Sequence, residues 1–167
     1  MTIDIDPIEH LHYHQWATNR LLDAAAKLDV EPLQRNLGTA YGSIFGTLVH
    51  LYQADVIWFT RLLGDSPASV NGVAPEQGIT KLTAEWALTQ ETLLGWAQKL
   101  GEQDWLRMVN YRTTAGDPYT HPVWRIILHL VNHGTLHRGQ VMAMFRQVGA
   151  KPPGTDLMFY YREVESR

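Results

Sequence analysis

Three of the eight histidines, His129, His133 and His137, recur at intervals of four residues near the end of the chain. Neighbours in such a series share one face of an α-helix and are separated by about 6 Å along its axis, close enough to bind one metal ion. His129 and His137 are about 12 Å apart, too far to share an ion easily. The spacing therefore predicts a metal site built on one adjacent pair.

The apolar residues of the same segment favour His133 and His137. On a helical wheel these two histidines fall on the apolar seam formed by Ile126, Leu130, Val141, Met144 and Val148, whereas His129 lies at its edge. Two imidazoles in a core are costly without partners, and a metal ion satisfies both. The alternative is a pair of hydrogen-bonded or half-exposed histidines without a metal.

A third protein ligand is expected, with a coordination position left open for water or substrate. The candidate is His50, in the middle of an earlier predicted helix. It lies about 110° from the centre of that helix's apolar stripe, so the wheel does not place it in the core. The residues on its own side are mostly small, however, which permits either close approach of another helix or a pocket beside the imidazole.

Another pair, His10 and His14, has the same spacing near the start of the first predicted helix and competes as a metal site. Helix ends fray and admit solvent, which weakens this alternative. His12 and His121 are expected at the surface.

Several other chemistries are excluded by what the sequence lacks. Without cysteine, the chain has no disulfide, catalytic thiol or thiolate-bound metal. Residues 133–137 lack the glutamate of the zinc-protease motif, and no nucleophile elbow, P-loop or dinucleotide fingerprint occurs. No Glu-x-x-His pair lies on an inner seam, which argues against a ferritin-like site. No catalytic residue is identified.

The composition indicates one domain over residues 1–167, since 45% of the 167 residues are hydrophobic. A net charge of −3 argues against nucleic-acid binding. No apolar stretch approaches the roughly 20 residues of a membrane span, and the acidic N-terminus shows no signal peptide. We therefore expect a cytoplasmic protein with neither nucleic acid nor membrane as partner.

Four segments with helical periodicity must position these histidines: residues 7–28, 43–64, 80–101 and 120–149. Asp6 and Ser43 are the expected N-caps, and Gly64, Gly101 and Gly149 the expected stops. Alternating residues around a turn at 116–118 predict a small hairpin before the last helix. The pattern predicts an all-α four-helix bundle, with a crossover in the long connection 64–79.

Several of these segments resemble the DinB family. They are Tyr-His-Gln-Trp-Ala-Thr-Asn at 13–19, Ser-Ile and Thr-Leu-Val-His at 43–44 and 47–50, the run 129–140 that ends in His-Arg-Gly-Gln, and Pro-Pro-Gly-Thr-Asp-Leu at 152–157 before Tyr160. The resemblance covers nearly the whole chain, and the histidine run is its most specific part. His14 stands where the family usually has Asn, a departure that can alter the pocket wall or add a ligand.

The resemblance implies an up-down-down-up bundle, usually a homodimer, with a divalent metal held by His50, His133 and His137. Imidazole-only sites suit zinc, nickel, copper and iron, and zinc or nickel is expected here, with iron as an alternative. The family includes thiol S-transferases that use bacillithiol or mycothiol, and related isomerases. The six tryptophans are consistent either with a dimer, since not all their rings fit inside one small bundle, or with ordinary core packing, and the resemblance favours the dimer.

The resemblance thus favours a metal-dependent enzyme that transfers a small thiol co-substrate. One alternative is a metal-dependent hydrolase, for which Asp55, facing solvent or capping a pair, is the nearest candidate base. Another is a non-catalytic stress-response protein with a structural metal, which would need four protein ligands.

Overall fold

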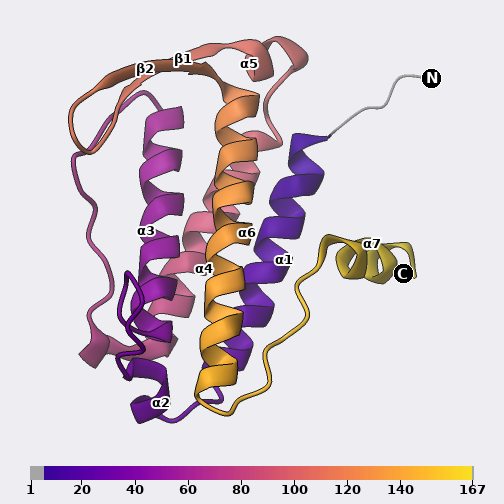
Figure 1. Ribbon diagram of the computed structural model, residues 1–167. Helices are drawn as coiled ribbons and strands as arrows, with labels where there is room; N and C mark the ends of the chain where they lie inside the picture. Colours follow the sequence, from indigo (N-terminus) through magenta and orange to yellow (C-terminus); the bar gives the residue numbers. More distant parts are fainter. Residues whose placement is uncertain (1–5, 167) are drawn as a thin grey trace.

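The computed structural model describes residues 6–166, which are mostly helical, as the sequence predicts (Figure 1). The first five residues, where no signal peptide was expected, and residue 167 lie outside the described residues. The elements are α1 (Pro7–Ala25), α2 (Val30–Gln34), α3 (Ile44–Leu62), the 3₁₀ helix η1 (Pro75–Gln77), α4 (Gly78–Ala97), α5 (Glu102–Leu106), β1 (Met108–Arg112), β2 (Pro118–Pro122), α6 (Val123–Gln147) and α7 (Leu157–Glu165).

N-cap side chains and glycines mark the ends of the long helices. Asp6 Oδ1 accepts from Ile8 N over 2.8 Å at the start of α1, and Ser43 Oγ accepts from Gly46 N over 3.0 Å at the start of α3. Gly64 and Gly149, which follow α3 and α6, have φ of +100° and +77°, values that favour glycine. Both expected N-caps are confirmed.

The four long helices α1, α3, α4 and α6 lie side by side (Figure 1). Figure 1 also shows that α1 and α6 run opposite to α3 and α4. Since α3 and α4 run in the same direction, the connection between them must return along the molecule, which explains its length. The short helices α2, α5 and α7 were not predicted.

The hairpin is confirmed. Strands β1 and β2 pair antiparallel, with Met108 opposite Pro122 and Tyr111 opposite Tyr119, and they cross one end of the long helices (Figure 1). Because β2 extends to Pro122, α6 begins at Val123, slightly later than the periodicity predicts.

The core has two apolar clusters. One, near the hairpin end, includes Leu11, Ile126 and Leu130, and the other includes Leu48, Trp86, Val141 and Phe145. Along α6 the two are separated by the turns that carry His133 and His137. A polar layer therefore crosses the middle of the molecule.

No helix within residues 6–166 combines the length and apolarity needed to span a bilayer.

Candidate metal centre

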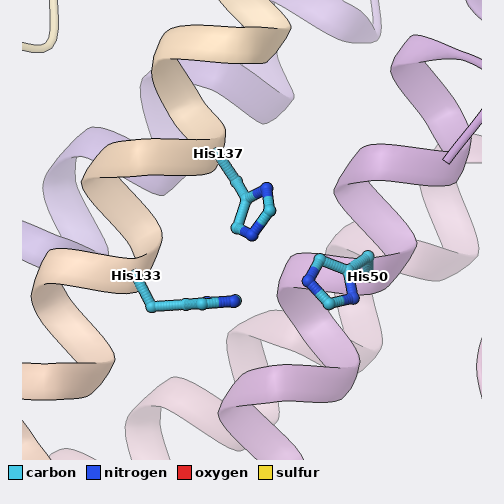
Figure 2. A group of neighbouring side chains, drawn as sticks. All are labelled: His50, His133 and His137. Carbon is cyan, nitrogen blue, oxygen red and sulfur yellow. The ribbon is translucent and has the colours of Figure 1, made fainter. Parts of the chain in front are cut away.

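The structure brings together the three histidines expected to bind metal. His50 on α3 and His133 and His137 on α6 each offer one ring nitrogen, and these nitrogens lie within 4.8 Å of one another. Figure 2 shows the two α6 rings projecting one turn apart toward α3, with His50 facing them. The ring centroids of His133 and His137 are 4.4 Å apart, and that of His50 lies 4.7 Å from His137.

The lowered pKa values of His50 and His133 suit metal ligands. Burial, reinforced by the neighbouring His137, lowers the pKa of His50 to about 4. Burial and then His137, His50 and His129 lower the pKa of His133 to about 4, while Asp55 opposes the shift. His50 Nε2 is buried without a hydrogen-bond partner, a cost that a metal would remove. Only neutral imidazole coordinates, so this donor set fits a divalent cation.

Two residues that sequence reasoning missed hold the rings in place. Gln140 Oε1 lies 2.8 Å from His137 Nδ1, and because an amide oxygen only accepts, Nδ1 carries the proton and Nε2 keeps its lone pair. The Tyr41 ring stacks on His50, with centroids 3.8 Å apart and an interplanar angle of 12°. The spacing of Gln140 three residues after His137 is a signal for its role, whereas Tyr41 lies in a loop and gives none.

His129 lies outside the cluster. Its ring packs edge-on against Trp58, with centroids 4.6 Å apart, and lies 5.9 Å from the ring of His133. Burial, together with Arg61 and His121, lowers its pKa. This placement is the one that the helical wheel predicts.

His10, which competes as a metal ligand, and His121, which is expected at the surface, make contacts away from the three-histidine cluster. His10 Nδ1 lies 2.9 Å from the Asp6 carbonyl oxygen, in the first turn of α1. His121 is half-buried in β2, with its Nδ1 3.1 Å from the Tyr111 hydroxyl, so the expectation of a simple surface residue at a helix start is wrong. Neither belongs to the three-histidine cluster.

His14 is buried in a polar network beside the site. Arg138 Nη1 lies 3.2 Å from His14 Nδ1, and because a guanidinium only donates, that nitrogen accepts. His14 Nε2 then donates to Asp55 Oδ2 over 3.0 Å. Both ring nitrogens are occupied, so His14 is not available as a metal ligand. Gly134 makes room for this ring, since a Cβ there would lie 2.5 Å from His14 Cε1.

Asp55 is buried rather than facing solvent. Its side chain is 3% exposed, and Oδ2 also accepts from Trp86 Nε1 over 2.6 Å. The carboxylate thus joins α3 to α1 and α4 and compensates the buried charge of Arg138 through His14.

A cavity of about 400 Å³ opens beside the cluster. Its walls include His50 and His133 together with Ile57, Trp58, Arg61 and Val70, and Asp55 is not among them. A ligand in this cavity therefore contacts two of the three histidines, and the arrangement is compatible with a metal site beside a cavity that accommodates a small molecule.

Comparisons with known proteins give the family. The model of the DinB family matches residues 1–166, and the chain therefore belongs to the DinB family. Protein DinB of Bacillus subtilis (strain 168) is 28% identical over 156 residues, covering 89% of each chain. A crystal structure of a DinB-like protein from Bacillus cereus ATCC 10987 is similar with a TM-score of 0.72 and 17% identity, covering 89% of this chain and 94% of that one. This last likeness shows the fold alone.

Proposed function

We propose that this protein binds one divalent metal ion through His50, His133 and His137 and catalyses transfer of a low-molecular-weight thiol to an electrophile. The observation that carries the proposal is the three-histidine cluster at the wall of a ligand-sized cavity. Zinc or nickel suits this donor set, and iron is the alternative.

The neutral state of the ligands matters for this chemistry. Three uncharged imidazoles leave the full positive charge of a cation in place, and a bound cation favours the thiolate, which is the nucleophile, over the thiol. The chain itself has no cysteine and so supplies no thiol of its own. Its residues hold the ligand rings, through Gln140 and Tyr41, and provide apolar cavity walls at Ile57 and Val70.

Hydrolysis has less support. The candidate base Asp55 is bound to His14 and Trp86 and does not line the cavity, and none of the described residues that line it is acidic. A purely structural metal also has less support, because such sites have four protein ligands and no Asp, Glu or Cys of residues 6–166 joins the three histidines.

A conjugation assay tests the proposal. Metal-loaded protein is incubated with small thiols and an electrophile, and the thioether product is measured for the wild type, His137→Ala and His129→Ala. We expect metal-dependent turnover that falls at least a hundredfold in His137→Ala and persists in His129→Ala. Absence of metal-dependent turnover with every thiol would overturn the proposal.

A further inference from the structure

Arg61, on the last turn of α3, is a buried cation without a counterion among the described residues. The residue is 4% exposed, and its Nε is buried with no hydrogen-bond partner. In the part of the chain that the structure describes, no carboxylate lies within ion-pair distance of its guanidinium. A buried charge without a partner is costly, so an arrangement of this kind needs an explanation.

The aromatic neighbours of Arg61 account for only part of its environment. The guanidinium carbon lies 4.4 Å from the centre of the Trp58 ring and 5.2 Å from that of Tyr111. Cation–π contacts stabilise the charge, but among residues 6–166 no acceptor is hydrogen-bonded to the guanidinium N–H groups. The other buried arginine of the described chain, Arg138, instead donates to His14 and Thr135.

Arg61 lines the same cavity as His50 and His133. The hydroxyl-bearing residues Ser69 and Thr114 add donors to its wall, and no acidic residue among the described ones contributes to it. Burial in this environment lowers the pKa of Arg61, whose ordinary value is so high that the group stays charged. The cavity therefore presents a fixed positive charge with donors, which is the chemistry that recognises an anion.

The positions along α3 give the length of such a ligand. The guanidinium lies over the ring of Trp58. Trp58 is eight residues after His50 on the same helix, a rise of about 12 Å along the axis. A ligand that reaches from the histidines to Arg61 must be elongated.

We propose that the Arg61 guanidinium binds the carboxylate or similar compact anionic group of an elongated ligand whose other end lies at His50 and His133. The inference rests on the proposed function, which places the other end of the ligand at the histidines. It adds that the substrate class of this site is anionic. Either the thiol or its electrophilic partner can carry the anionic group.

Calorimetric titration of the metal-loaded protein tests this with three probes. The first is 6-mercaptohexanoate, the second is its neutral analogue 6-mercaptohexanol, and the third is hexanoate, which lacks the thiol. The variants are Arg61→Met, which keeps an unbranched stem against Trp58, and Arg61→Lys, which keeps the charge. Arg20→Met is the matched control, since Arg20 also stacks on a tryptophan, with its guanidinium carbon 4.9 Å from the Trp16 ring centre, but lies outside this cavity.

We expect the wild type to bind 6-mercaptohexanoate about tenfold or more tightly than 6-mercaptohexanol, the effect of charge-assisted hydrogen bonds. The preference disappears in Arg61→Met, survives in part in Arg61→Lys and is unchanged in Arg20→Met. Equal affinity of the wild type for both thiols would overturn the inference and leave the proposed function standing. This comparison uses the wild type alone, so it does not depend on whether the variants fold.

The thiol-free probe separates the two proposals. If hexanoate binds with the same dependence on Arg61 while 6-mercaptohexanol does not bind at all, the anion site is supported and thiol binding at the histidines is contradicted. A competition experiment shows which substrate carries the anionic group. If the thiol carries it, one molecule fills the cavity from the histidines to Arg61, and hexanoate and 6-mercaptohexanol compete. If the electrophile carries it, the two probes bind at the same time. Failure of hexanoate and 6-mercaptohexanoate alike to respond to Arg61→Met overturns the inference.

Discussion

The Nδ1 of His137 lies 2.8 Å from the Oε1 of Gln140, one turn further along α6. This contact fixes the tautomer and the ring orientation of His137, so that its Nε2 lone pair is directed to the side of the ring where His50 and His133 lie (Figure 2). The run that ends in His-Arg-Gly-Gln therefore supplies a candidate metal ligand together with the residue that orients it.

Replacing Gln140 is expected to weaken metal binding without removing it. In Gln140→Leu the His137 ring loses its acceptor, and such losses lower metal affinity by about 10- to 100-fold. Gln140 is exposed, so we expect the lower end of that range. Gln140→Glu, which keeps an acceptor, is the matched control and should stay near the wild type in a competition titration with a chelator. An unchanged affinity in Gln140→Leu would show that the contact does not orient the ligand.

Acid is expected to destabilise the metal-free protein between pH 6.5 and about pH 4. The pKa values of His50 and His133 are about 4 in the folded state, against an ordinary value of 6.5, so the unfolded chain binds more protons in this window. Stability is therefore fully present above pH 6.5 and is lost as the pH falls toward 4. Urea unfolding at a series of pH values measures the free energy of unfolding, with a His50→Ala, His133→Ala double variant as the control. A wild-type value that stays constant over this pH window would contradict the prediction. So would a value that falls as steeply in the double variant.

Removing Asp55 is expected to destabilise the fold strongly. Asp55 and Arg138 are both almost fully buried and are joined through His14, so Asp55→Ala leaves the Arg138 charge uncompensated. Breaking a buried pair in this way costs about 3–5 kcal/mol. The control, Asp23→Ala on the exposed side of α1, should change stability by no more than about 0.5 kcal/mol. Equal denaturation midpoints for the two variants would show that the network contributes little.

The homodimer stays a prediction. Of the six tryptophans only Trp86 is fully buried. Trp105, Trp124 and the exposed Leu106 line a cavity between α5, α6 and the start of α1, whose wall also includes Asp6 and Glu102. We expect sedimentation at micromolar concentration to give twice the mass of the 19.0 kDa chain. A single 19.0 kDa species would rule this out.

The sequence predicts most of the fold and two of the three clustered histidines, for a physical reason. The long helices repeat their apolar residues over several turns, and His133 and His137 fall on such a repeat. His50 does not, because a wheel measures a residue against the stripe of its own helix, whereas His50 faces α6 across the polar layer. For that histidine the family resemblance was needed.

The remaining parts of the site depend on contacts between distant segments. Asp55 meets His14 across 41 residues, and Arg61 is placed against Tyr111 of the hairpin. The periodicity of a sequence does not predict contacts between side chains so far apart in the chain. The helices α2 and α5 have five residues each, too few for a pattern to appear.

Metal content tests the central claim most directly. Protein purified without a histidine tag is analysed for metals by mass spectrometry as the wild type, His137→Ala and His129→Ala. We predict one divalent ion per chain in the wild type and in His129→Ala, and none in His137→Ala. The latter should also lose the stabilisation that metal provides, about 4 kcal/mol when free metal is a thousandfold above its Kd. A His129→Ala protein without metal, beside a His137→Ala protein that retains it, would contradict the account.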